Sequence, residues 1–425
     1  MSVDLCLLCI LLIPLAATGL ALIHQGLGRS RSAAHAMLAT LCSLAIIAIV
    51  FVLIGSAWMG FPTGLAHIVH VRHAPLDWLG AEPFFGLGLR FGVLHRPYAA
   101  LVVALGLFAV GMASLIPISS GSDRWRLAAI CAASVLFAGL YFPLFGHWVW
   151  GGGWLAQLTP LFGLPAFTDV GGAGVLQVVG GLAALSVAWI LGPRQGKYAD
   201  GIAAAIPGHN IVQVLFGCIF ALMGWIGLEA AAGILFHHAD FSQVVLTVIN
   251  AVLAASSGCL AAVLTTQIRY RKPDASLSAN GWIAGLVAGS AGCGLLSPLA
   301  TIVIGLVAGA LVTLLVEALE LRLFIDDPGG AISVHLGAGL WGLLAFGVFG
   351  PTQGSRIALV LAQLIGIATL LGLMFPLIHM SHRLLNRLVP FRVDGDGDWQ
   401  GMDIRELGAG AYPEFVVHAD EFVPR

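Results

Sequence analysis

One pattern occurs twice in this chain, as DVGGAGVLQ at residues 169–177 and as DPGGAISVH at residues 327–335. The aspartate, the Gly-Gly-Ala and the polar ninth residue coincide, and a Gly-Leu pair follows at the same distance in both copies. The ninth residue is Gln177 in the first copy and His335 in the second, and each lies in an apolar segment where lipid does not tolerate polar side chains. Two polar groups at matching places in two half-repeats predict a pore or a binding site near a pseudo-two-fold axis.

The composition indicates the class of protein. Of the 425 residues, 59% are hydrophobic and 9% are charged, and the mean hydropathy is +0.97. A soluble core of this length needs far more charged surface, so we expect a polytopic membrane protein. The net charge is −2 and no basic patch offers a site for nucleic acid. The cysteines lie in apolar runs, and no phosphate loop, nucleophile elbow or dinucleotide fingerprint occurs. We therefore expect no enzyme activity, no cofactor and no metal site.

The apolar runs predict the fold. Runs of spanning length predict an all-α membrane protein with eleven transmembrane helices. Their predicted ranges are 4–25, 36–59, 97–118, 126–148, 172–192, 208–236, 243–268, 279–296, 298–324, 331–349 and 356–384. The repeated pattern opens the fifth and the tenth helix, which predicts an inverted 5+5 repeat with halves at about 1–195 and 200–350. The long eleventh helix, at about 356–384, completes a transmembrane domain over residues 1–389, and residues 390–425 form a polar tail.

Positive charges in the short connections predict the orientation, because cytoplasmic loops carry an excess of lysine and arginine. Alternate connections hold Arg29 and Arg31, Arg124 and Arg126, Arg194 and Lys197, and Arg269, Arg271 and Lys272. With the first of these connections inside, we expect a multi-pass protein of the cell inner membrane. Its N-terminus then lies outside and its C-terminal tail lies in the cytoplasm.

Several motifs together carry a resemblance to a known family. They are HWVWGGGWL at 147–155, IPGHN at 206–210, AGCG at 291–294 with SPL at 297–299, IDDP at 325–328, and GMD at 401–403 with GAGAYP at 408–413. In this order, and over essentially the whole chain, they resemble the ammonium transporter (Amt/Mep/Rh) family. The resemblance implies a homotrimer in the lipid bilayer with one ammonium-carrying pore per subunit. It also implies a tail that couples the subunits, with a cytosolic PII-type protein as a candidate partner.

The resemblance also shows where this chain departs from the family, which makes it a divergent member. Trp150 matches the tryptophan of the family's external cation site, and Trp225 matches on the sixth helix. Leu228 stands at a gate phenylalanine, Glu229 at a usual asparagine and Ala232 at the serine of the external site. The two phenylalanines of the third helix align near Leu105 and Ala109, with Phe108 one residue away. Gln177 replaces the first of two facing histidines and His335 matches the second. The first helix has His24-Gln25-Gly26 in place of an aromatic residue and two glycines.

Elementary chemistry assigns roles to the outer residues of this set. Trp150 offers a cation–π face for NH4+. Asp169 is a good N-cap for the fifth helix and complements the helix dipole, and it favours a cation if it is buried below that face. Interfacial anchoring is the competing interpretation of the tryptophans at 148, 150 and 154.

The inner residues have two interpretations each. His335 accepts, relays or excludes a proton if it faces a cavity, or else it is a satisfied packing residue. Gln177 cannot relay protons as histidine does, but it can fix the tautomer of His335 or bind ammonia. Glu229 is either an extra cation ligand or a carboxylate close enough to the membrane surface to reach water.

Two functions follow from these alternatives. The first is a trimeric transporter that recruits NH4+ outside and passes NH3 and H+ through a hydrophobic pore. The second is an ammonium-binding sensor that conducts poorly and signals through its tail. The altered residues at 177, 228 and 229 favour the sensor, whereas the near-complete length of the family pattern favours transport.

Overall fold

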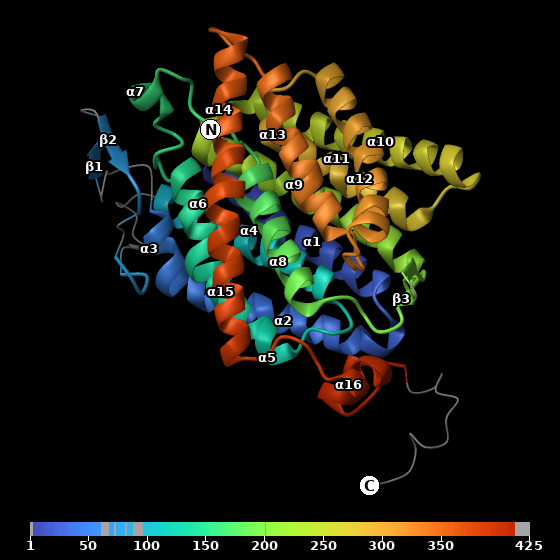
Figure 1. The fold of residues 1–425 in the computed structure, drawn as a ribbon. Helices are drawn as coiled ribbons and strands as arrows, with labels where there is room; N and C mark the ends of the chain where they lie inside the picture. The colour runs from blue at the N-terminus through green and yellow to red at the C-terminus, as the bar shows by residue number, and fades with distance from the viewer. Residues whose placement is uncertain are drawn as a thin grey trace.

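The long apolar runs fold into a bundle of helices, which Figure 1 shows in the computed structural model. The structure describes residues 3–60, 68–71, 74–80, 83–87, 97–199 and 201–412. Its first half contains α1 (Val3–Leu27), η1 (Ser30–Ser32), α2 (Ala33–Val50), η2 (Phe51–Gly55), α3 (Ser56–Met59), α4 (Pro97–Gly121), α5 (Leu127–Leu136), η3 (Phe137–Tyr141), α6 (Phe142–Val149), α7 (Leu158–Phe162), η4 (Ala173–Val178) and α8 (Val179–Leu191).

The second half also consists mainly of long helices. It contains α9 (Ile211–His237), α10 (Phe241–Tyr270), α11 (Ala275–Gly289), η5 (Ser290–Gly292), α12 (Pro298–Arg322), η6 (Ile332–Gly337), α13 (Ala338–Phe349), α14 (Arg356–Thr369), η7 (Leu370–Met374), α15 (Phe375–Leu388), α16 (Gly395–Gln400) and η8 (Asp403–Leu407). Two short antiparallel hairpins pair β1 (Ile68–Val71) with β2 (Ala74–Asp77) and β3 (Tyr198–Ala199) with β4 (Ile202–Ala203). The bundle is helical as predicted, and the hairpins are additions that the apolar runs do not reveal.

Ten helical segments in the described part of the chain are long and apolar enough to cross a membrane. The chain is therefore a multi-pass membrane protein. The eighth predicted segment, 279–296, forms α11 with 15 residues and then η5. Fifteen residues rise about 22 Å as an α-helix, which is less than the thickness of a bilayer core. The predicted count of eleven spans is therefore not confirmed.

Local sequence signals set several helix ends. Ser297 accepts a hydrogen bond from the Ala300 N–H and precedes Pro298, which occupies the first helical position of α12. Asp240 and Gln243 form a capping box at the start of α10. These residues explain why one apolar stretch ends and the next begins where it does.

Small residues let the helices approach closely. At Gly224 of α9, a side chain would collide with the backbone of Ala16 on α1, and at Gly285 of α11 it would collide with Ala254 on α10. Close backbone approach of this kind replaces the hydrophobic driving force that is lacking between helices in lipid. It gives close packing between α1 and α9 and between α10 and α11.

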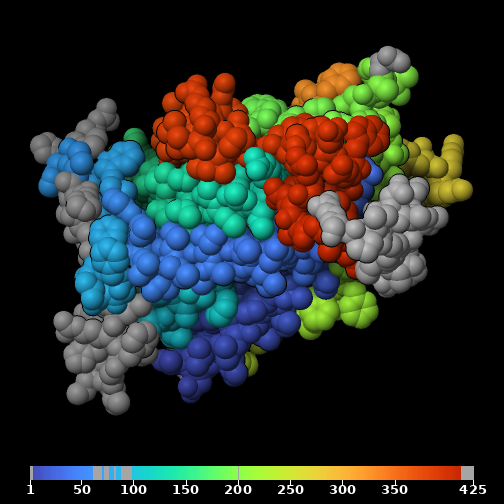
Figure 2. Space-filling model, turned by 90° about the horizontal axis from the view of Figure 1, so that it is seen from below, coloured from blue at the N-terminus to red at the C-terminus, as the bar shows by residue number. Residues whose placement is uncertain are grey.

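The tail lies against one end of the bundle, opposite the end where α1 begins (Figure 1). Seen from below, its red atoms cover parts of the blue and cyan helices (Figure 2). Carboxylates of the tail cap two of these helices, although they are far from them in the sequence. Asp403 accepts the N–H groups of Ala34 and His35 at the start of α2, and Glu406 accepts the N–H of Leu127 at the start of α5. The acidic residues of the tail thus satisfy helix donors that have no partner within their own helices. Residues 413–425 of the predicted tail lie outside the described residues.

Candidate functional site

The repeated pattern folds in the same way in both copies. Asp169 Oδ2 accepts the N–H groups of Gly174 and Val175 at 2.8 and 2.9 Å, and Asp327 Oδ2 accepts that of Ile332 at 2.7 Å. The second glycine of each copy has a positive φ, +88° at Gly172 and +69° at Gly330, which glycine adopts without a steric cost. Each aspartate therefore caps the helix that carries the polar ninth residue.

The two aspartates differ at their second oxygen. Asp327 Oδ1 accepts a hydrogen bond from the Ser120 hydroxyl at 2.6 Å. Asp169 Oδ1 is buried and has no hydrogen-bond partner among the described residues. Burial raises the pKa of Asp169 to about 6, and the backbone N–H groups around the carboxylate limit this rise. An unpartnered buried carboxylate oxygen is costly unless a cation or a donor approaches it.

An aromatic pair lies beside Asp169. Trp150 is 3% exposed, and its indole N–H donates to the backbone carbonyl of Asp169 at 2.8 Å. Its ring stacks on Phe236 with centroids 4.8 Å apart and an angle of 9° between the planes. Trp150 therefore lies inside the bundle and is not a residue of a lipid-facing belt. Ala232, also buried, lies one helical turn before Phe236 on α9.

The structure does not bring Phe108 to this pair. Phe108 is partly buried in the middle of α4, and none of the described ring contacts includes it. The aromatic side chain that stacks on Trp150 is Phe236 of α9. The sequence signal for Phe236 is its position near the end of α9, two turns beyond Glu229, but no motif distinguishes it from other phenylalanines.

Glu229 lies in a buried polar chain of three side chains. The indole N–H of Trp225 donates to the Ser290 hydroxyl oxygen at 2.9 Å. The one Ser290 hydroxyl hydrogen has two acceptors in reach, Glu229 Oε1 at 2.7 Å and the Leu286 carbonyl at 2.8 Å. Glu229 is 1% exposed, so the interpretation that it reaches water at the membrane surface is wrong. Its Oε2 has no hydrogen-bond partner in the described part of the chain. No sequence motif distinguishes Ser290, because its contact with Glu229 depends on how α11 packs against α9.

Gln177 and His335 face each other in the middle of the bundle. Gln177 Oε1 and His335 Nδ1 are 2.7 Å apart, and both side chains are at most 2% exposed. The carbonyl oxygen of Gln177 only accepts hydrogen bonds, so Nδ1 of His335 carries the hydrogen and Nε2 keeps a lone pair. The Nε2 atom of Gln177 is buried without a partner among the described groups. The pair joins η4 to η6, the two copies of the repeated pattern.

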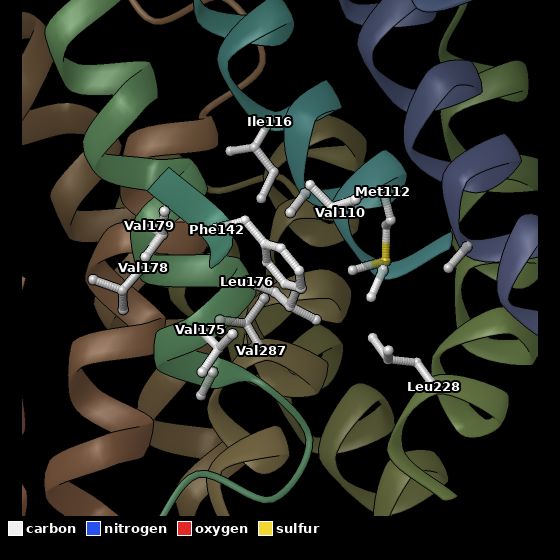
Figure 3. Packing of buried hydrophobic residues seen from close by; sticks show 14 of the residues in the cluster. Val110, Met112, Ile116, Phe142, Val175, Leu176, Val178, Val179, Leu228 and Val287 are labelled. Carbon is white, nitrogen blue, oxygen red and sulfur yellow. The ribbon is translucent and has the colours of Figure 1, made fainter. Parts of the chain in front are cut away.

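Apolar side chains fill the space around these polar groups. Leu228 of α9 is fully buried, and Figure 3 shows it in the same cluster as Met112 of α4 and Leu176, the residue before Gln177. Leu228 thus places an aliphatic side chain at a position where a phenylalanine ring would be bulkier. On the tail side, a cavity of about 320 Å³ is lined by Asp327, Gly208 and Ser333. Ser333 lies two residues before His335 in the sequence.

Comparison with known proteins shows which family the chain belongs to. The model of the Ammonium Transporter Family matches residues 5–412. The chain belongs to this family. Ammonium transporter Amt2 of Archaeoglobus fulgidus is 31% identical, with 96% of this chain and 88% of that protein covered. The ammonium transporter of Bacillus subtilis is 28% identical over 96% of this chain and 97% of its own length.

Solved structures share the fold of this family member. A sensor Amt protein superposes with a TM-score of 0.85 at 24% identity, covering 95% of this chain and 97% of the other. Mep2 of Candida albicans superposes with a TM-score of 0.78 at 20% identity, covering 99% and 93%. At these identities the likeness establishes the fold and leaves the altered site residues to be interpreted from their own contacts.

We expect Glu229→Gln to weaken ammonium binding about tenfold, because the amide cannot carry a negative charge for the cation, while its oxygen can still accept a hydrogen bond from Ser290. The measurement is isothermal titration of ammonium into the purified detergent-solubilised protein. Glu317→Gln is a suitable control, since Glu317 lies on α12 and pairs with Arg269 at a partly exposed position. Equal affinity of the Glu229→Gln variant and the wild type would remove Glu229 from the binding site.

Proposed function

We propose that this protein transports ammonium across the membrane. NH4+ is recruited from the outside at Trp150 and Asp169, and NH3 and H+ pass the apolar wall at Leu228 to reach Gln177 and His335. The protein acts as a homotrimer with one pore per subunit, its N-terminus outside and its tail in the cytoplasm of a cell with an inner membrane.

One observation carries this proposal. The two repeat-related aspartates cap their helices alike, yet only Asp327 has both oxygens hydrogen-bonded, whereas Asp169 Oδ1 is left without a partner beside Trp150. A purely structural cap does not require an unpartnered oxygen in a buried place. A monovalent cation that can donate hydrogen bonds supplies both the charge and the donor that this oxygen lacks.

A sensor is the second candidate. It is supported by Gln177, which cannot pass a proton as histidine does, and by Glu229, a buried carboxylate that can hold a cation in place. A sensor Amt protein shares the fold. In this alternative the bound cation changes the contact between the bundle and the tail, where a cytosolic PII-type protein is the candidate partner.

The deciding experiment is an electrical recording on proteoliposomes after an ammonium jump, at several lipid-to-protein ratios. Turnover gives a current whose decay becomes faster as more protein is incorporated. Binding without translocation gives a decay that is independent of protein density, and empty liposomes give the background. The first outcome supports transport and the second supports the sensor.

We expect Gln177→His to raise the ammonium current and to shift its pH dependence, because a second imidazole at this position can exchange a proton with His335. The expected increase is about threefold or more, since a positioned acid–base group commonly contributes far more than that. The pH profile of the proteoliposome current is the measurement. Unchanged current and pH profile would mean that residue 177 does not take part in proton transfer.

A further inference from the structure

His24 is a buried histidine that the proposed pore does not yet use. It lies on α1 and is 7% exposed. Its ring carbon Cδ2 is 3.9 Å from the place that a Cβ on Gly329 would occupy, and Ser119 Oγ is close to the same place. The Ser119 hydroxyl is buried without a hydrogen-bond partner among the described residues. Gly329 belongs to the repeated pattern that ends at His335, so His24 lies beside the segment that positions His335.

His24 and His335 also interact electrostatically. His335 Nδ1 is engaged by Gln177, which leaves Nε2 as the atom that can accept a proton. A proton on Nε2 must leave again through Nε2, because the other nitrogen faces a carbonyl oxygen. Gln177 cannot receive it, so the facing histidine of the relatives has no substitute at position 177.

A second path begins on the other side of His24. A cavity of about 10 Å³ is lined by His24, His35, Ser32, Asp123 and Arg29. This volume is close to the minimum that holds one water molecule, and the lining supplies several polar partners. His35, on α2, is 4% exposed and places its Nε2 3.0 Å from Glu406 Oε2.

Glu406 connects this path to solvent at the tail. Its side chain is 16% exposed. Burial acts to raise the pKa of Glu406, but the hydrogen bonds from His35 and from the Leu127 N–H and the charge of Arg126 outweigh it and lower this pKa. Because its pKa is low, Glu406 does not retain a proton that it receives from His35 but releases it to the bulk solvent.

We propose that His24 is a proton-relay residue, taking the proton that ammonium releases at His335 and passing it through one water to His35 and Glu406. The inference rests on the proposed transport. In the first step an N–H bond of NH4+ breaks as a bond to His335 Nε2 forms, and NH3 leaves. The proton then moves from Nε2 to His24, next through the water to the His35 ring, and finally from His35 to Glu406 and solvent. One proton leaves for each NH4+ that is split, and no group is oxidised or reduced.

The charged and titratable groups around His24 are consistent with this direction. His335 on η6 is within electrostatic range of it, and His35, Asp123 and Arg29 line the cavity beside it. Asp123 accepts hydrogen bonds from the Arg29 N–H at 3.1 Å and from the Arg194 guanidinium at 2.8 Å. The negative charge of Asp123 offsets the positive charge of Arg29 beside the cavity, so a transient positive charge on His24 or His35 is tolerated.

The test uses His24→Gln, which keeps polarity and approximate size but cannot carry a proton. Full-length protein in proteoliposomes is studied after an ammonium jump, with the current and the lumenal pH recorded together. We expect the proton-coupled current of the variant to be at least about tenfold lower than that of the wild type. The change in lumenal pH that accompanies the current should fall by the same factor. His35→Gln should show the same loss.

His382→Gln is the matched control, since His382 is 1% exposed on α15, contacts Ser186 and does not line the cavity between His24 and His35. Its current should equal that of the wild type. Wild-type current together with an unchanged current in folded His24→Gln or folded His35→Gln would overturn the relay. If the wild type itself shows no turnover, the proposed transport fails, which is a separate result. If His24→Gln does not fold, the His35→Gln measurement decides.

Discussion

Asp169→Asn is expected to reduce ammonium affinity about 100-fold, or ~2.7 kcal/mol, while the protein remains folded. The Asn oxygen can still accept the N–H groups of Gly174 and Val175, so the helix cap is kept. The amide nitrogen, however, replaces the unpartnered Oδ1 and removes the negative charge. Titration of ammonium into the purified variant, together with its proteoliposome current, measures both consequences.

The pH dependence gives the same carboxylate a second signature. The pKa of Asp169 in the folded protein is about 6, above the ordinary value of 3.8. A raised folded pKa means that the contribution to stability is complete below the ordinary value and is lost as the pH rises through about 6. At neutral pH the Asn variant avoids this loss, so its melting temperature should equal or exceed that of the wild type. Wild-type affinity for ammonium should fall as the pH drops below about 6.

The repeat supplies the matched control for this prediction. Asp327→Asn changes the same residue type in the same local structure, but both oxygens of Asp327 already have hydrogen-bond donors. We expect ammonium affinity to stay within about threefold of the wild type. A similar loss of affinity in both variants would show that the cap geometry, and not the free oxygen of Asp169, determines binding.

The repeated pattern predicts more of the site than any other feature of the sequence. The cap by Asp169 and the positive φ at Gly172 depend on residues within one short stretch, and such local geometry depends on few neighbours. The same holds for most helix ends, which are set by caps and by proline. The meeting of Gln177 with His335 is a contact between distant segments, and it is predicted only because the echo of this stretch implies a pseudo-two-fold axis.

Contacts between distant segments could not be predicted in this way. Phe236 stacks on Trp150 only because the end of α9 packs beside the end of α6. Ser290 reaches Glu229 from a segment that follows α11, and His24 approaches His335 from α1. Nothing in the spacing of these residues distinguishes them from ordinary packing residues. The side-chain register between helices decides their roles, and this register is a tertiary property.

Arg194→Met is expected to have the largest effect on stability, because Arg194 lies in a buried ionic cluster where the first half-repeat meets the start of the repeated pattern in the second. Its guanidinium donates to both oxygens of Asp326 at 2.9 and 3.0 Å and to Asp123 at 2.8 Å. Burial alone would raise the pKa of Asp326, but Arg124 and Arg194 outweigh burial and lower that pKa to about 2. Asp326 is therefore ionised at every physiological pH.

Removing Arg194 leaves this buried carboxylate with Arg124 at 3.8 Å as its remaining charge partner. Loss of one partner from a buried ion pair typically costs about 3–5 kcal/mol, because the other charge cannot regain its hydration. Thermal unfolding in detergent at neutral pH measures this loss as a lower melting temperature.

Arg269→Met is the control, because the exposed Arg269–Glu317 pair is screened by solvent and should contribute little. Since Asp326 directly precedes the Asp327 cap, Arg194→Met should also impair transport, and Asp326→Asn in the same chain should restore part of the stability by removing the unpaired charge. If Arg194→Met melted at the wild-type temperature, the cluster would not hold the two halves together.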